Sequence, residues 1–167
     1  MLRMSAEEYR LLCKKAGSFE RQDVPDFQEE GKKKSAKHRN VKVYVYKDGL
    51  VANEKLEGHG GVEEKYDSKK EYQRCLELRL LEKAGRISDL RRQTSLLISE
   101  AFVDSGGKKH RAITYCADFI YVEDGREVVE DVKGYSRTKQ QYLCTEAFRL
   151  KWKMLQKLYP DKVFRLY

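Results

Sequence analysis

The sequence predicts an α/β (α+β) domain whose mixed sheet is flanked by helices and preceded by a basic N-terminal extension. Three observations support this prediction. Two stretches with apolar residues at helical spacing occur after residue 66, and three stretches rich in β-branched and aromatic residues lie between them. Short turn signals join these strands and predict antiparallel pairs, whereas a helix precedes the last strand and predicts a parallel pair. The expected order over residues 66–167 is therefore α-β-β-β-α-β.

The extension is expected over residues 1–65. A capping box at Ser5 starts a short helix, and a polar linker fills residues 18–40. Alternating valines before Asp48-Gly49 predict a β-hairpin.

The core helices and strands are predicted from caps and turns. A capping box from Ser68 to Glu71 starts a helix that stops at Gly85. Strands are expected at residues 94–102, 111–122, 127–133 and 163–167, with turns at 104–109 and at Asp124-Gly125.

A cap at residues 138–141 is expected to start a long helix that ends before Pro160. Its core stripe is predicted to be Leu143, Ala147, Leu150, Met154 and Leu158, widened by Phe148, Trp152, Leu155 and Tyr159.

Two carboxylates and a lysine are predicted to converge in this sheet. Asp131 and Lys133 share one face of the third strand, while Glu130 points to the other. A two-residue turn at Asp124-Gly125 places Asp118 of the second strand opposite Asp131. Strict alternation gives Asp118 the face that also holds Thr114, Cys116 and Ile120.

Adjacent carboxylates repel each other, and burying them is costly unless a cation is present. Mg²⁺ takes one or two carboxylates together with water and substrate phosphate. Such an ion lowers the pKa of a bound water, and a nearby lysine orients that water or neutralises the phosphate. The alternative is an ion cluster without a catalytic role, in which Lys133 emerges to solvent.

The order of helices and strands, together with the pattern of acids and lysine, resembles that of a known family. The runs YDSKKEYQRCLELRLLEKAGRISDLRRQ, YCADFIY and VVEDVKG make residues 66–167 similar to the PD-(D/E)XK nuclease superfamily. The resemblance is nearest to an uncharacterised group of phage proteins, and more distant to transposon-end endonucleases and Holliday-junction resolvases. It implies phosphodiester hydrolysis with Mg²⁺ or Mn²⁺. Asp118, Asp131 and the backbone carbonyl of Val132 would be metal ligands, and Lys133 the catalytic lysine. Ala117 replaces the proline of the literal motif.

Two further site residues are implied by the same resemblance. Glu71 matches a metal-facing glutamate on the first helix of many relatives, although it also occupies the capping-box position and could only cap. Gln93 is expected to open the first strand, where relatives place a glutamine near the metal or phosphate. An ordinary polar residue at a strand start is the alternative.

The net charge of +8 suits a polyanionic partner. Backbone neutralisation and aromatic stacking predict nucleic-acid contacts for Lys32, Lys33, Lys34, Lys37, Arg39, Lys42 and Tyr44. Lys139 and Lys151 near the C-terminal helix are further candidates. The alternative for these positions is a solvated linker, a lysine-protected edge strand and a solvated basic helix face.

These expectations describe a metal-dependent DNA endonuclease that acts on phage or mobile-element recombination or replication intermediates, including branched DNA. The alternatives are a catalytically silent nuclease-fold module that binds nucleic acid or a partner, and a subunit of a transposase complex. The resolvase resemblance implies a homodimer. No membrane, signal peptide or nucleotide cofactor is expected. The scattered cysteines predict free thiols in a reducing cytoplasm, the host's if a phage encodes the chain, with Cys75, Cys116 and Cys144 packed in the core.

Overall fold

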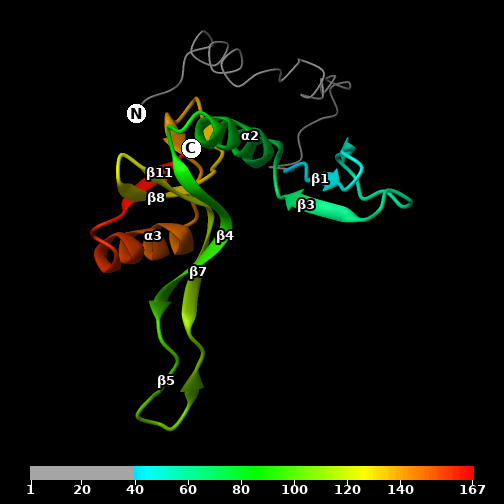
Figure 1. Cartoon of the computed structure of the whole chain (residues 1–167). Coiled ribbons are helices and arrows are strands. Elements are labelled where there is room, and N and C mark those ends of the chain that lie inside the picture. The colour runs from blue at the N-terminus through cyan, green and yellow to red at the C-terminus, as the bar shows by residue number, and fades with distance from the viewer. Residues whose placement is uncertain (1–39) are drawn as a thin grey trace. The chain divides into compact units, whose positions relative to one another are not determined.

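The computed structural model describes residues 40–167, which form two compact units, residues 40–84 and residues 85–167 (Figure 1). The predicted helix at Ser5, the linker and the basic residues from Lys32 to Arg39 lie outside the described residues. The predicted domain boundary after residue 65 stays a prediction. No helix in the described part of the chain is long and apolar enough to cross a membrane.

The N-terminal unit contains a small antiparallel sheet with the strand order β2-β1-β3. Its strands are β1 (Val43–Tyr46), β2 (Val51–Ala52) and β3 (Val62–Tyr66). The predicted hairpin is confirmed, because β1 pairs antiparallel with β2. In its turn the Leu50 amide donates to Asp48 Oδ1 at 3.1 Å, and Gly49 adopts a φ of 85°. The pairing of β3 with β1 was not predicted.

Helix α2 (Lys69–Lys83) follows β3. The Ser68 cap is confirmed, since the Glu71 amide donates to the hydroxyl of Ser68 at 3.1 Å. The Glu71 side chain reaches back as expected, and its Oε2 accepts the amide of Asp67, the residue before the cap, at 3.0 Å. The helix ends before Gly85, which takes the left-handed conformation that such a stop requires.

The C-terminal unit is built on a four-stranded sheet with the order β11-β8-β7-β4. These strands are β4 (Ser88–Ser99), β7 (Ile113–Glu123), β8 (Arg126–Asp131) and β11 (Val163–Leu166). β4, β7 and β8 are antiparallel neighbours, whereas β11 runs parallel to β8. The mixed α+β fold and the predicted order α-β-β-β-α-β are thus confirmed, with small two-stranded ribbons added.

Helix α3 (Glu146–Leu158) covers one face of this sheet. Its residues Phe148, Trp152 and Leu155 pack on Ile120 and Val129, and together with Leu96, Ile98 and Ala117 they form the core. Whether α2 covers the other face stays a prediction, because α2 belongs to the N-terminal unit.

The predicted start of α3 is wrong. The helix begins at Glu146, where the hydroxyl of Thr145 accepts the Phe148 amide at 3.2 Å. Residues 138–140 instead fall in the loop of a ribbon formed by β9 (Tyr135–Ser136) and β10 (Gln141–Tyr142), and Gln141 is the first residue of β10. The Tyr135 and Tyr142 rings meet edge to face across it at 5.3 Å, so aromatic pairing prevails over a capping pattern there.

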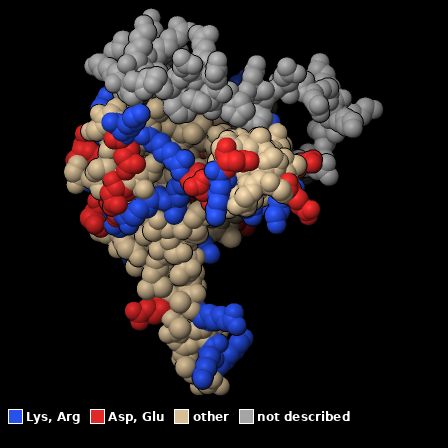
Figure 2. Space-filling model, turned by 45° about the vertical axis from the view of Figure 1, so that its right-hand side comes forward, with Lys and Arg blue, Asp and Glu red and all other residues tan. Residues whose placement is uncertain are grey.

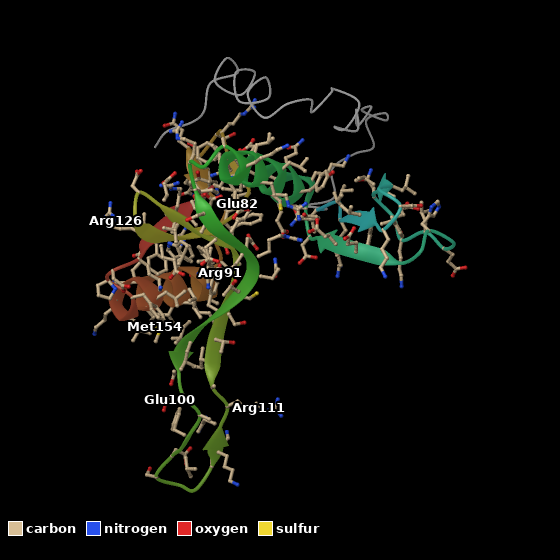
Figure 3. The ribbon with its side chains drawn as sticks, viewed as in Figure 1. Glu82, Arg91, Glu100, Arg111, Arg126 and Met154 are labelled. Atoms are coloured by element: carbon tan, nitrogen blue, oxygen red, sulfur yellow. The ribbon has the colours of Figure 1, made fainter. Side chains whose placement is uncertain are left out.

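The leucine stripe predicted for α3 is also wrong, whereas three of the residues predicted to widen it are confirmed as buried. Leu150, Met154 and Leu158 are 62%, 38% and 49% exposed, and Figure 3 shows Met154 on the side of α3 that lies away from β8. The buried face is the one with Phe148, Trp152 and Leu155. On this face the Phe148 and Trp152 rings stack at 5.3 Å, and Trp152 meets Phe164 of β11 edge to face at 5.2 Å, so that aromatic packing against the sheet favours it.

Strands β4 and β7 extend past the rest of the sheet as a two-stranded arm (Figure 1). β4 begins six residues before its predicted start at residue 94. The arm ends in a ribbon of β5 (Phe102–Val103) and β6 (Lys109–His110), where the Phe102 and His110 rings stack at 4.6 Å. Lysine and arginine side chains are exposed at its tip (Figure 2).

Candidate active site

The two predicted carboxylates lie on neighbouring strands, Asp131 at the end of β8 and Asp118 within β7. The register of β7 and β8 pairs Glu123 with Arg126 and Phe119 with Glu130, and the same register continued by one position puts Asp118 opposite Asp131. There the backbone ladder stops, and Asp118 Oδ2 accepts the Val132 amide at 2.8 Å. The register predicted from the Asp124-Gly125 turn is therefore correct.

Asp131 is a buried carboxylate, only 2% exposed, and each of its oxygens accepts one hydrogen bond and keeps a further acceptor site. Its Oδ1 accepts from the Tyr115 hydroxyl and its Oδ2 from the Lys133 ammonium. A charge-assisted pair of this kind offsets the cost of burying an anion. Lys133 is held in turn over the ring of Phe148, with Nζ 4.5 Å from the ring centroid. The acid and the lysine of VVEDVKG therefore meet on the α3 side of the sheet.

Tyr115 is a site residue that the sequence analysis missed. Burial, the hydrogen bond to Asp131 and the charges of Asp131 and Asp118 all raise the pKa of Tyr115 far above its ordinary value of 10.0. The hydroxyl therefore stays protonated and donates to Asp131. No alternation argument could find it, because strict alternation places Tyr115 on the face opposite Asp118.

That alternation fails in the middle of β7. Tyr115, Ala117 and Ile120 all join the core beneath α3, although residues 117 and 120 would point to opposite faces in a regular strand. The break coincides with Gln93 on β4, which has a φ of 49° and lies where β4 would pair with Asp118. The prediction that Thr114, Cys116, Asp118 and Ile120 share one face is therefore wrong.

Gln93 lies beside Asp118. The prediction that Gln93 begins the first strand of the core is wrong. Gln93 lies in the middle of β4. Its Nε2 makes a long 3.5 Å contact with Asp118 Oδ1, and its Oε1 accepts from the thiol of Cys116 at 3.3 Å. Gln93 thus contacts Asp118, one member of the acid pair formed by Asp118 and Asp131.

The three cysteines in the described range are free thiols, as predicted. Cys75 is buried and Cys144 is half-buried, whereas Cys116, which was predicted to pack in the core, is exposed.

Glu130 lies on the opposite face from Asp131, as predicted. It is fully buried and accepts from the Tyr121 hydroxyl at 2.8 Å, and Arg165 donates to that same hydroxyl at 2.9 Å. This separate chain of hydrogen bonds supplies the local partner that a buried carboxylate needs.

Glu71 performs the capping role that the sequence predicted. Its backbone amide donates to the Ser68 cap and its side chain accepts the Asp67 amide, and the residue is 4% exposed. A role as metal ligand stays a prediction, because Glu71 belongs to the N-terminal unit and the acid pair to the C-terminal unit.

The described nucleic-acid candidates occupy separate elements. Lys42 is exposed and Tyr44 half-buried in the N-terminal unit. Lys139 is exposed in the loop between β9 and β10. The Lys151 ammonium donates to the Thr114 carbonyl on β7 at 3.3 Å, which ties α3 to the arm. Their role in binding stays a prediction.

The donors at the acid pair fit a hard divalent cation. Among residues 40–167, no three His, Cys, Asp or Glu side chains gather at a point that could hold a metal ion, but Mg²⁺ needs only one or two carboxylates. The Val132 carbonyl accepts no hydrogen bond within this range. Because the N–H and C=O of an extended residue point to the same neighbouring strand, that carbonyl faces Asp118. Two carboxylates and a peptide oxygen are therefore at hand.

Comparisons with known proteins identify a family but no chemistry. A search of curated proteins finds no match to this chain. The family model described as "Protein of unknown function (DUF1064)" matches residues 56–166, which is more than half of the chain. The match includes Asp118, Asp131, Val132 and Lys133 together with all of α2 and α3. The chain therefore belongs to the DUF1064 family.

Proposed function

We propose that this protein is a metal-dependent DNA endonuclease. The observation that supports this most directly is that Lys133 pairs with Asp131 at the end of β8, while Asp118 of β7 accepts the amide of Val132, the residue between them. The carbonyl of Val132 has no hydrogen-bond partner in the described range. Two hard carboxylates beside a lysine suit phosphodiester hydrolysis, because the transition state gains negative charge that cations stabilise.

Each residue has a distinct role in this proposal. Asp118, Asp131 and the Val132 carbonyl would hold Mg²⁺ or Mn²⁺, which when bound supplies Lewis-acid stabilisation of the phosphate and a more acidic water. Lys133 lies within reach of the same point and would orient the water or neutralise the phosphate. Tyr115 would be a positioning residue, since its hydroxyl donates to the Asp131 carboxylate and holds it in place.

The substrate class follows from the family resemblance of the sequence. We propose DNA intermediates of phage or mobile-element recombination and replication, with branched DNA included. The net charge of +8 favours binding of such a polyanion.

The test is cleavage of linear duplex, single-stranded, flap and four-way-junction DNA in Mg²⁺, Mn²⁺ or EDTA. We expect metal-dependent cutting by the wild type. Asp118→Asn, Asp131→Asn and Lys133→Met should each lower the rate by about 100-fold or more, while DNA binding persists.

Two variants serve as matched controls. Asp124→Asn makes the same chemical change in the exposed β7–β8 turn, and Lys157→Met does so on the exposed surface of α3. Both should cut like the wild type. If all variants cut equally well, the site assignment is wrong. If no substrate is cut with either metal while DNA is still bound, the module that only binds nucleic acid is the correct interpretation.

A further inference from the structure

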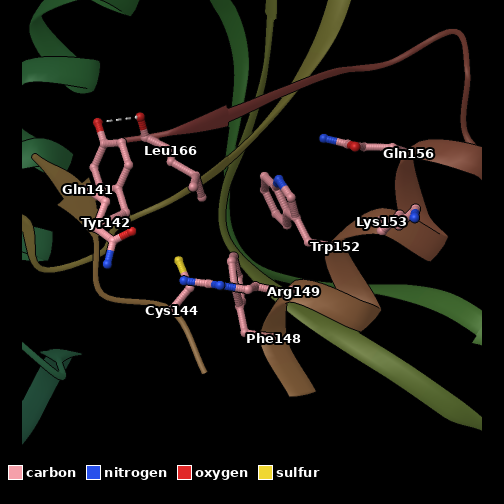
Figure 4. A pocket seen from close by; sticks show the side chains of 9 residues that line it. All are labelled: Gln141, Tyr142, Cys144, Phe148, Arg149, Trp152, Lys153, Gln156 and Leu166. Carbon is pink, nitrogen blue, oxygen red and sulfur yellow. Dashed lines mark hydrogen bonds between the residues drawn. The ribbon is translucent and has the colours of Figure 1, made fainter. Parts of the chain in front are cut away.

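A cavity of about 530 Å³, widely open to solvent, lies between α3, β10 and β11 (Figure 4). Phe148 and Trp152 of α3 and Leu166 of β11 form its apolar interior. The Tyr142 hydroxyl donates to the Leu166 carbonyl at 3.0 Å and closes one side. The volume falls in the range of pockets that hold small organic ligands.

The polar residues of this cavity are cationic or neutral. Arg149, Lys153 and Gln156 project from α3, and all three are exposed. Within residues 40–167, neither Arg149 nor Lys153 pairs with a carboxylate, and no residue that lines the cavity is acidic. A matching ligand therefore has a flat apolar body, hydrogen-bonding edges and a negative charge.

A nucleotide has all three of these properties. Its base is flat and can enter an apolar pocket, its edges bind amides, and its phosphate pairs with arginine and lysine. A base inside a duplex cannot enter such a pocket unless it leaves the stack, so the pocket favours an unpaired nucleotide.

The cavity shares a wall with the candidate active site. The Phe148 ring that lines it also supports Lys133, at 4.5 Å from Nζ to the ring centroid. The Phe148 ring centroid also lies 6.0 Å from that of Tyr115, the hydrogen-bond donor to Asp131. A nucleotide in the cavity would therefore lie next to the strand segment whose phosphate reaches Asp131 and Lys133.

We infer that this cavity binds one unpaired nucleotide of the DNA strand, through the apolar wall of Phe148 and Trp152 and the cationic rim of Arg149 and Lys153. The inference rests on the proposed function and sharpens it. The enzyme is then selective for DNA with a displaced or unpaired nucleotide beside the scissile phosphate, as in single strands, flaps and junctions, over continuous duplex.

The chain has a single tryptophan, and it is Trp152. Its intrinsic fluorescence therefore reports directly on this cavity. We would titrate the full chain in EDTA, where no cleavage is expected, with a 12-nucleotide oligo(dT), a blunt duplex of the same length, a duplex with a one-nucleotide flap, and free dTMP. The single strand and the flap should quench Trp152 saturably, with an affinity about tenfold above that of the blunt duplex.

Charge-removing variants distinguish a specific role of the cationic rim of the cavity from an effect of net charge alone. Arg149→Met and Lys153→Met should each weaken binding of the single strand about tenfold, while Lys157→Met, which removes the same charge from a residue of α3 outside the cavity, should change it less than twofold. Far-ultraviolet circular dichroism checks that α3 is intact in each variant.

Several results would overturn the inference. They are equal quenching by duplex and single strand, equal losses in Arg149→Met and Lys157→Met, or no quenching at all. If dTMP quenched Trp152 with the same affinity as oligo(dT), the cavity would be assigned to a free nucleotide instead. Because these measurements need no catalysis, quenching without cleavage in Mg²⁺ or Mn²⁺ rejects the endonuclease proposal alone, and cleavage without selective quenching rejects the cavity assignment alone.

Discussion

Tyr115→Phe tests the electrostatics of the site without altering a charged residue. The substitution removes the hydroxyl that donates to Asp131 Oδ1 and keeps the ring, which packs 6.0 Å from Phe148 and 5.9 Å from Trp152. A hydrogen bond to a charged acceptor contributes about 1.5–3 kcal/mol. We therefore expect the variant to be about 2 kcal/mol less stable to urea than the wild type at pH 7.

The stability advantage of the wild type over Tyr115→Phe should fall as the pH rises and should not change on the acid side. Burial and Asp131 raise the pKa of Tyr115 in the folded state, whereas the unfolded chain has the ordinary value of 10.0. The stabilisation is therefore complete below pH 10 and is lost as the pH rises, because the unfolded wild type gains an ionised form that the folded state resists. Above pH 10 the wild type should lose about 1.4 kcal/mol per pH unit relative to Tyr115→Phe, so that the two variants become equally stable near pH 11.5.

Urea unfolding of both proteins from pH 7 to pH 11.5 measures this change. Tyr135→Phe is the matched control, since Tyr135 is 49% exposed, and it should change stability by less than about 0.5 kcal/mol at each pH. A stability difference for Tyr115→Phe that stays constant across this range would refute the reasoning, as would equal stability at pH 7.

Two further predictions concern α3 and are measured by urea unfolding at pH 7. Thr145→Ala should cost about 1 kcal/mol because Thr145 caps the helix, whereas Thr138→Ala should have almost no effect; the reverse order would restore the start predicted from the sequence. Leu155→Ala should cost about 2–5 kcal/mol, since Leu155 is fully buried, while Leu150→Ala, at 62% exposure, should stay within about 0.5 kcal/mol. Similar losses at the two leucines would mean that the leucine stripe is packed after all.

The parts of the site that the sequence predicts are those fixed by local rules. A two-residue turn at Asp124-Gly125 determines the register of its two strands, and with it the meeting of Asp118 and Asp131. The capping box at Ser68 likewise fixes the start of α2. In each case a few neighbouring residues set the geometry, so no knowledge of distant contacts is needed.

The parts that the sequence does not predict depend on distant contacts or on unusual backbone. The phase change in β7 accompanies a glutamine with positive φ on another strand, and a non-glycine residue rarely adopts that conformation. Tyr115 reaches Asp131 only because of this change. The face of α3 was mistaken because leucine spacing and aromatic spacing both fit a helix, and only packing against Ile120 and Val129 decides between them.

The start of α3 bears directly on the site, because it sets the position of Phe148. The Thr145 hydroxyl accepts the Phe148 amide, so Phe148 lies in the first turn of the helix. From there its ring supports Lys133, packs beside Tyr115 and lines the cavity with Trp152. If the helix began at residue 138, Phe148 would lie in the middle of the helix instead of its first turn. The β9–β10 ribbon, whose residues Gln141 and Tyr142 form the other side of the cavity, would then be lost. By placing Phe148, the cap at Thr145 thus helps to position Lys133, Tyr115 and the wall of the cavity. The candidate active site and the proposed nucleotide pocket therefore depend on the same helix start.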